Sequence, residues 1–252
     1  MSKESEPKSE PEPKAITELK SGESKPEHRS IRSYVLRAGR MTVAQKTALA
    51  ELEGVYGIAP ELSRPLDLDA LFGRSAPRVM EIGFGVGDSL VEMAAANPDQ
   101  DYFGVDVFRG GVGNLYRQVA EQGLSNVRAA CADAVELLAD AIAPGTLDRV
   151  QVFFPDPWPK ARHHKRRLVQ APFLRMIKSR LRVGGVIHLA TDWADYAEFM
   201  LEQIHQVEGL RNTAGPGLFT PRPETRPLTK YERRGQRLGH EVWDLILEVE
   251  AN

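Results

Sequence analysis

The chain has 252 residues, of which 42% are hydrophobic, and a formal net charge of −2 at pH 7; this composition is typical of a globular protein with one full core. No stretch approaches the roughly 20 apolar residues that cross a bilayer, and the polar first residues lack the apolar segment of a secretory signal. The single cysteine, Cys131, excludes an internal disulfide and a cysteine-based zinc cluster. We therefore expect a cytoplasmic protein with no bound metal, no membrane contact and no obligatory protein partner.

The first residues of the chain have little to bury. Residues 1–28 are mostly Ser, Glu, Lys and Pro, which predicts a disordered tail. Residues 29–60 are expected to form a basic segment followed by a helix over 42–55, which Thr42 would cap. The rest of the chain, residues 61–252, is predicted to form one domain.

From residue 78 onward, short apolar runs alternate with helical patterns. Strands are predicted at 79–82, 102–107, 126–132, 148–154, 185–191 and 240–250. Helices are predicted at 88–97, 112–122, 135–141, 172–181 and 193–207. This alternation is typical of an α/β protein in which helices cover both faces of a parallel sheet.

A glycine-rich turn follows the first predicted strand. Its glycines are spaced G-x-G-x-G rather than G-x-G-x-x-G: Gly83, Gly85 and Gly87. Glu81 precedes them, where a carboxylate could receive the amino-acid end of a cofactor. Asp106 and Asp133 end the next two strands, near the expected positions of ribose hydroxyls and adenine. A dinucleotide would also present a ribose diol to Asp106, and Asp133 could simply cap a helix. Taken as a set, these residues favour S-adenosylmethionine.

The loop after the fourth predicted strand carries the residues best suited to catalysis. Ligands of open α/β sheets lie beyond the carboxyl ends of the strands, so this loop should face the cofactor. Prolines on both sides of Asp156 restrict its backbone, and Trp158 offers a flat surface for a base. The alternative is a rigid loop around a buried Trp, but it does not explain the basic sequence ARHHKRR at 161–167.

Positive charge gathers in three segments although the net charge is near zero. Residues 160–182 contain nine Lys or Arg and no acid, and residues 29–46 contain five Lys or Arg and no acid. A third basic segment covers residues 222–237. Clustered positive charge is typical of a surface that binds a polyanion. For any one segment, a solvated face with acidic neighbours from elsewhere in the chain is the alternative.

Several motifs together resemble one enzyme family. They are FFPDPWPKARHHKRR at 153–167, LATDW at 189–193, RPLTKYERRG at 226–235, and IRSY with a following GR at 31–40. In this order they resemble the bacterial tRNA (guanine-N7-)-methyltransferase family over residues 30–249. The resemblance implies a Rossmann-like class I methyltransferase domain at residues 61–252, with a mostly parallel seven-stranded sheet. It also implies methyl transfer from S-adenosylmethionine to N7 of a guanine in tRNA, at nucleotide 46 of the variable loop.

The resemblance further implies roles for individual residues. Glu81, Asp106, Asp133 and Asp156 would line the cofactor pocket, and Asp156 would also be the catalytic residue. Substrate contacts would come from Lys160, Asp192, Thr229, Lys230, Tyr231 and Glu232. RNA contacts would come from Arg162, His163, His164, Lys165, Arg166 and Arg167. The family usually has Glu at the position of Asp106, and His and Pro at those of Phe108 and Gly110.

The chemistry of the nucleophile limits the mechanisms to consider. Guanine N7 carries a lone pair and no proton, so its methylation needs no general base. A covalent route to a pyrimidine carbon would need a cysteine in the catalytic loop, whereas Cys131 lies on the third predicted strand. The alternatives are a methyltransferase for another RNA, a small molecule or a protein, and a non-catalytic RNA-binding module with the same fold.

Overall fold

The structure is a computed structural model, and it describes residues 32–34, 40–58, 65–228, 232 and 241–251. The predicted tail at residues 1–28 lies outside these ranges. So do three of the expected substrate contacts, Thr229, Lys230 and Tyr231.

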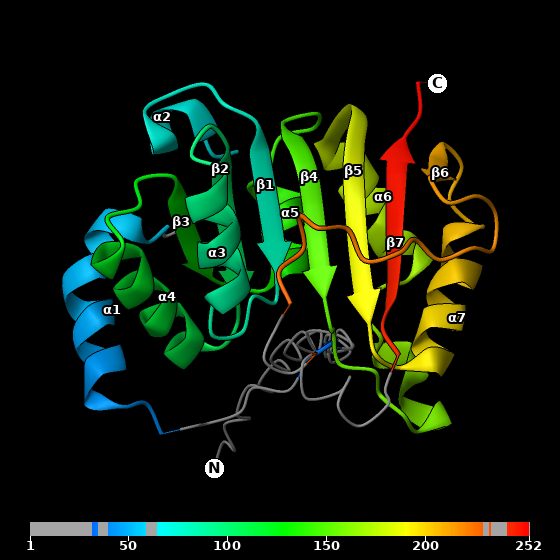
Figure 1. Cartoon of the computed structure of the whole chain (residues 1–252), viewed down its shortest axis with the longest axis horizontal. Coiled ribbons are helices and arrows are strands. Elements are labelled where there is room, and N and C mark those ends of the chain that lie inside the picture. The colour runs from blue at the N-terminus through cyan, green and yellow to red at the C-terminus, as the bar shows by residue number, and fades with distance from the viewer. Residues whose placement is uncertain (1–31, 35–39, 59–64, 229–231, 233–240, 252) are drawn as a thin grey trace, which may run out of the picture. The chain divides into compact units, whose positions relative to one another are not determined.

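The described chain is built on one seven-stranded sheet (Figure 1). Its strands are β1 (Arg78–Ile82), β2 (Asp101–Asp106), β3 (Val127–Cys131), β4 (Leu147–Phe153), β5 (Leu181–Thr191), β6 (Leu210–Asn212) and β7 (Trp243–Val249). The spatial order is β3-β2-β1-β4-β5-β7-β6. The first five strands pair in parallel, and β7 runs antiparallel to β5 and β6. The expected α/β architecture is therefore confirmed. β6 was not among the predicted strands, and β5 begins at Leu181 rather than at residue 185.

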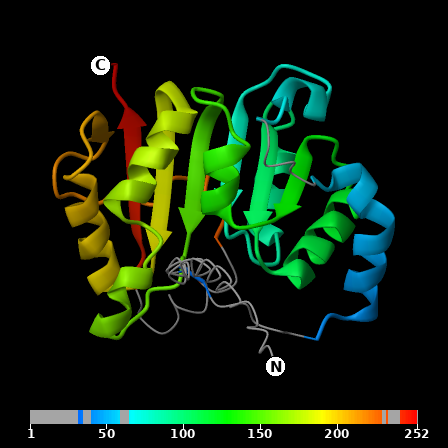
Figure 2. The same ribbon diagram turned by 180° about the vertical axis from the view of Figure 1, so that it is seen from behind.

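Helices cover both faces of this sheet (Figures 1 and 2). They are α1 (Val43–Tyr56), α2 (Leu68–Phe72), α3 (Asp88–Ala96), α4 (Arg109–Glu121), α5 (Ala134–Asp140), α6 (Ala171–Arg180) and α7 (Ala194–Ile204), with a 3₁₀ helix, η1 (Ala161–Arg166). One apolar core lies between the sheet and α1, α3 and α4, and a second lies between the sheet and α5, α6 and α7. Successive strand residues alternate between the two cores: Val79 and Tyr102 face the first, and Met80 and Phe103 the second.

An extended segment, residues 220–228, crosses β4, β5 and β7 on the face that α3 and α4 cover elsewhere (Figure 1, orange). Thr220 forms an isolated bridge with Asp244 of β7. Farther along, the Arg226 guanidinium lies 5.9 Å and 5.6 Å from the ring centres of Phe153 and Phe154. This segment therefore anchors the C-terminal part of the described chain against the end of β4.

Glycines let α4 approach the glycine-rich turn closely. A Cβ atom added at Gly111 would lie 1.9 Å from the backbone oxygen of Gly85. At Gly113 it would lie 2.5 Å from the backbone oxygen of Gln45 in α1. Backbone atoms cannot move aside as a flexible side chain does, so these two positions fix the spacing between α1, α4 and the turn.

Substituting Gly111→Ala should therefore lower the free energy of unfolding by about 1–3 kcal/mol, because the new methyl group overlaps backbone. Gly54→Ala in α1 is the matched control: nothing lies within 4 Å of its added methyl group. Ala is favoured over Gly in a helix by up to about 1 kcal/mol, so this variant should be as stable as the natural chain or more so. Urea unfolding measures both, and equal stability of the two variants would contradict the close approach.

Candidate functional site

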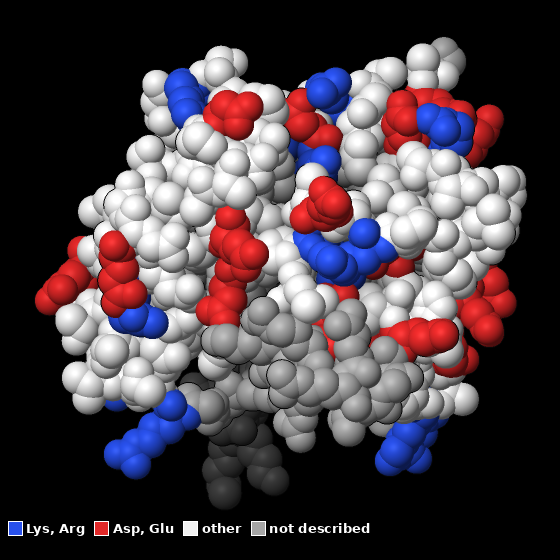
Figure 3. Space-filling view, in the orientation of Figure 1, with Lys and Arg blue, Asp and Glu red and all other residues white. Residues whose placement is uncertain are grey.

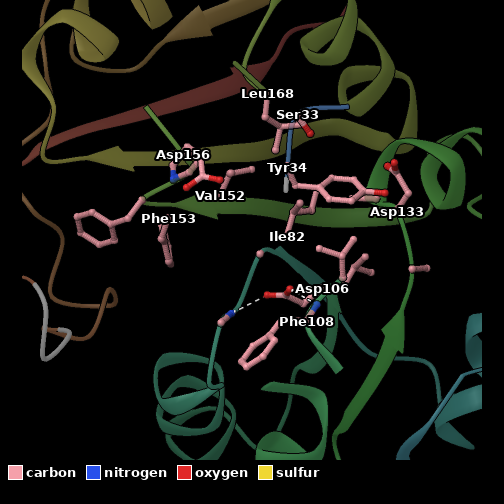
Figure 4. A pocket seen from close by; sticks show the side chains of 18 of the residues that line it. Ser33, Tyr34, Ile82, Asp106, Phe108, Asp133, Val152, Phe153, Asp156 and Leu168 are labelled. Carbon is pink, nitrogen blue, oxygen red and sulfur yellow. Dashed lines mark hydrogen bonds between the residues drawn. The ribbon is translucent and has the colours of Figure 1, made fainter. Parts of the chain in front are cut away.

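A cavity of about 690 Å³ opens where β1, β2, β3 and β4 end. Because these strands are parallel, their carboxyl ends meet at one edge, and the strand order reverses between β1 and β4. Five of the residues that the sequence singled out line this cavity together: Gly83, Gly85, Asp106, Asp133 and Asp156. Figure 4 shows the three carboxylates around the same space.

The glycine-rich turn forms one wall of the cavity. Gly83, Gly85 and Gly87 have φ values of 78°, 62° and 86°, in the left-handed region that favours glycine. No atom lies within 4 Å of a Cβ built at Gly83 or Gly85, whereas one at Gly87 would meet Leu115 of α4 at 2.8 Å. Two of the glycines thus leave room for a ligand, and Gly87 serves packing.

Asp106 is fixed at the end of β2 by two backbone amides. The amide of Gly85 donates to its Oδ2 at 2.8 Å, and the amide of Phe108 donates to its Oδ1 at 2.8 Å. Burial raises the pKa of Asp106, and these hydrogen bonds oppose that shift. Since each carboxylate oxygen accepts more than one hydrogen bond, Asp106 keeps acceptor capacity for the hydroxyls of a ligand.

Asp133 has both of the roles that the sequence left open. Its Oδ1 accepts from the amide of Val135 at 2.9 Å, which caps α5. The same residue lines the cavity. The cap therefore holds the carboxylate in place beside the space for a ligand.

Glu81 differs from the other acids because it is not among the residues that line the cavity. Its side chain is buried and accepts from Nε2 of Gln151 in β4 at 3.0 Å. Burial raises the pKa of Glu81 to about 7. A carboxyl group with a raised pKa therefore lies in β1, two residues before the first glycine of the turn.

The loop after β4 has an unusual backbone on either side of Asp156. Phe154 and Trp158 have φ values of 52° and 47°, a conformation that costs bulky residues energy and that often marks functional sites. The amide of Phe154 still donates to the backbone oxygen of Ala190 in β5 at 2.8 Å. Beyond this hydrogen bond the loop turns away from the sheet, and Asp156 lines the cavity while remaining exposed to solvent.

The buried side chain of Arg167 stabilises this loop. Its side chain is 1% exposed, its Nε donates to the backbone oxygen of Pro157 at 3.0 Å, and its guanidinium pairs with Asp195. The guanidinium also lies 4.9 Å from the ring centres of Tyr196 and Phe199. The expected RNA contact at Arg167 is therefore corrected: a guanidinium buried among these partners supports the loop and does not face a phosphate.

The other basic residues of η1 are more accessible. Arg162 and Lys165 are exposed, and His163, His164 and Arg166 are partly exposed. Lys160 and Asp192, expected to contact the substrate, are exposed just beyond β4 and β5. Figure 3 shows basic side chains projecting from the lower edge of the molecule, where the parallel strands end.

Trp158 takes part in contacts within the protein. Its Nε1 donates to the backbone oxygen of Ser33 at 3.0 Å. The Arg166 guanidinium lies 4.9 Å from the centre of its ring, and the His163 ring lies edge-on at 5.9 Å. The indole thus joins the loop to a segment more than a hundred residues earlier in the sequence.

Glu232 lies in a buried network of charged side chains. Arg226 donates to its two carboxylate oxygens at 2.6 Å and 2.9 Å, and to those of Asp244 at 2.7 Å and 2.9 Å. Nε2 of His188 lies 2.7 Å from Oδ1 of Asp244. Glu232 is 3% exposed, so its expected contact with a substrate would require access through this network.

Sequence reasoning did not identify several residues that shape the site. Ser33, Tyr34, Met41 and Phe108 line the cavity. Two signals were available in the sequence: Ser33 and Tyr34 belong to the IRSY motif, and Phe108 is a position where the chain departs from the family pattern. Among the described residues, no three His, Cys, Asp or Glu side chains form a group that could hold a metal ion. Every helix in the described part of the chain is too short or too polar to span a bilayer.

Comparison with known proteins gives a consistent family. Residues 75–245 match the model of a family described as putative methyltransferase. The chain is 55% identical over 227 residues to the tRNA (guanine-N(7)-)-methyltransferase of Pseudomonas putida strain F1, covering 90% of this chain and 94% of the relative. It is 52% identical over 236 residues to the enzyme of that name from Pseudomonas syringae pv. tomato strain DC3000, covering 94% and 96%.

Solved structures support the fold. The 16S rRNA methyltransferase KamB aligns with a TM-score of 0.55 at 16% identity, covering 75% of this chain and 95% of that one. An antibiotic-related methyltransferase aligns with a TM-score of 0.50 at 14% identity, covering 75% and 99%. At these identities the similarity concerns the fold alone.

The buried carboxylate leads to a prediction about pH. The pKa of Glu81 is raised from 4.5 to about 7 in the folded chain, so the folded state holds this proton more tightly than the unfolded state does. Relative to Glu81→Gln, the natural chain should lose stability as the pH rises from about 4.5 to about 7, by at most about 3 kcal/mol. Urea unfolding of both proteins at about pH 5 and about pH 8 measures this. A stability difference that does not change with pH would contradict the shift.

Proposed function

This chain belongs to the tRNA (guanine-N(7)-)-methyltransferase family, and on that basis we propose that it methylates N7 of guanine 46 in tRNA, using S-adenosylmethionine, in the cytoplasm. The reaction is assigned to residues 61–252. The observation that supports it best is the convergence of the glycine-rich turn, Asp106, Asp133 and Asp156 on one cavity, beside the basic helix η1.

The cavity has the chemistry that S-adenosylmethionine requires. The open space beside Gly83 and Gly85 would admit the cofactor against the backbone, and Asp106 would accept from the ribose hydroxyls. Asp133 would lie at the adenine end. Glu81, behind the turn, would attract the positively charged amino group of the cofactor. When bound, the cofactor supplies an electrophilic methyl group on a positively charged sulfur.

The protein's part in the reaction is to place and stabilise the guanine. N7 has a lone pair and no proton, so no side chain has to remove one. Asp156 would accept hydrogen bonds from N1–H and the amino group of the base, which fixes its orientation. Its negative charge would also stabilise the positive charge that develops on the base. The left-handed residues Phe154 and Trp158 and the buried Arg167 would hold Asp156 in place for this task.

The exposed cations beside the cavity would hold the RNA. Lys160, Arg162, Lys165 and Arg166, with the two histidines of η1, would lie along tRNA phosphates. Asp192 at the end of β5 would be a second acceptor near the base. Thr229, Lys230, Tyr231 and Glu232 would add further substrate contacts, as their motif implies.

The decisive experiment is nucleoside analysis of tRNA after incubation with the protein and methyl-labelled S-adenosylmethionine. We expect label in 7-methylguanosine, and none when nucleotide 46 is changed from guanosine to adenosine. Label in a different nucleoside would overturn the proposed N7 specificity, and label in the altered tRNA would overturn the proposed position.

In the same assay, Asp156→Asn and Asp156→Ala should reduce the single-turnover rate at least about tenfold, which is about 1.4 kcal/mol, and Ala should reduce it more. Asn keeps one acceptor oxygen but loses the charge. The rate of the natural chain at saturating cofactor should be nearly constant from roughly pH 7.5 to 9, because no proton leaves N7. A rate that rises tenfold per pH unit would instead indicate deprotonation of an amino or imino nitrogen.

Changing Arg162, Lys165 and Arg166 together to Ala should weaken tRNA binding and make it less dependent on salt. With three fewer phosphate contacts, the slope of log affinity against log salt should fall in magnitude by roughly 2. The control carries Ala at Arg117 and Arg211, which pair with Glu121 and Glu248. An unchanged slope in the triple variant would mean that η1 is a solvated surface without contact to tRNA.

A further inference from the structure

Tyr34 lies in the cavity itself, far in sequence from the other lining residues. Figure 4 shows its ring extending across the space above Ile82, with the hydroxyl directed at Asp133. Burial raises the pKa of Tyr34, and the negative charge of the nearby Asp133 carboxylate raises it further. The tyrosine therefore sits at the end of the cavity where β3 gives way to α5.

The backbone before Tyr34 is attached to the loop after β4. The hydrogen bond from Nε1 of Trp158 to the backbone oxygen of Ser33, at 3.0 Å, makes this attachment. The Arg166 guanidinium in turn covers the Trp158 ring at 4.9 Å. Trp158 is not among the residues that line the cavity, so any influence of its indole on a ligand there must pass through neighbouring residues.

The chemistry at this end of the cavity suits a flat aromatic group. The Tyr34 ring supplies an apolar face, and a purine gains roughly 1–3 kcal/mol by stacking on an aromatic side chain. Asp133 is already fixed as the cap of α5, and the Tyr34 hydroxyl points toward it, so the face of the ring stays free for a ligand.

We propose that Tyr34 is a further cofactor-binding residue whose ring covers the adenine of S-adenosylmethionine, and that Trp158 is a positioning residue that holds Tyr34 there. The inference rests on the proposed cofactor. Because Trp158 also contacts Arg166 of η1, the cofactor site and the RNA-facing helix share one set of contacts.

Calorimetric titration of the full chain with S-adenosylhomocysteine, without tRNA, tests both roles. Tyr34→Ala should weaken binding about fivefold or more, since the stacking surface is lost. Tyr34→Phe keeps the ring and should weaken binding less than Tyr34→Ala does, because the stacking surface remains. Trp158→Phe keeps an aromatic ring but loses the N–H, and should weaken binding about two- to threefold.

A double variant separates a linked effect from two independent ones. If Trp158 acts through Tyr34, adding Trp158→Phe to Tyr34→Ala should cause no further loss, so the two effects should not add. Trp243→Phe is the matched control: the same chemical change in β7, where the indole packs 6.4 Å from Phe219, should leave the affinity unchanged. Thermal unfolding of every variant shows whether it is folded. If Tyr34→Ala does not fold, Tyr34→Phe and Trp158→Phe still keep an aromatic ring in place, and the loss expected of Trp158→Phe against the Trp243→Phe control still tests the inference.

The outcomes distinguish the inference from the proposed function. A natural chain that fails to bind S-adenosylhomocysteine would overturn the proposed cofactor and this inference with it. If the natural chain binds S-adenosylhomocysteine and Tyr34→Ala binds it with the same affinity, the inference alone is overturned. Tighter binding by Tyr34→Ala would overturn it too, because Tyr34 would then occupy the space that the adenine needs. Additive effects in the double variant would remove the positioning role of Trp158.

Discussion

The parallel pairing of β1 with β2 on one side and β4 on the other is the constraint on which the site depends. In the observed register, Ile82 lies beside Val105 and Val152, so the three strands end together. The glycine-rich turn, Asp106 and the loop with Asp156 therefore leave the sheet at one place, although they come from distant parts of the sequence. The amide of Gly85 then donates to Asp106 across the gap between β1 and β2. The position of the cavity at this edge is thus set first by the strand register and only then by side chains.

Two buried guanidinium groups stabilise the parts of the site that lie outside the sheet. Arg167 joins the loop after β4 to α7 through Pro157 and Asp195, and Arg226 joins Glu232 to Asp244 of β7. Each also lies over aromatic rings, which lowers the cost of taking the charge out of water. Both belong to sequence segments whose positive charge suggested a polyanion surface. Part of that charge is therefore structural, and the basic side chains of η1 are the accessible part of the first segment.

Much of the fold and the acids that line the cavity were predictable because their signals are local. An apolar run followed by closely spaced glycines identifies β1 and its turn, and Asp106 and Asp133 stand at the ends of comparable runs. The contacts of Arg167, Trp158 and Tyr34 were not predictable, because each depends on a partner far away in the sequence. β6 escaped prediction because a strand of three residues, Leu210–Asn212, has too few positions to show an alternating pattern.

The position of β7 in the sheet has a consequence for the order of assembly during synthesis. β5 pairs with β4 on one side, but its other neighbour is β7, which is synthesised only after residues 192–242. Until then the eleven-residue strand β5 is an open edge, with the unpaired amides and carbonyls that recruit other chains. β7 also brings Asp244, the partner of both Arg226 and His188. A nascent chain that has not yet reached β7 thus exposes a strand edge that can pair with other chains.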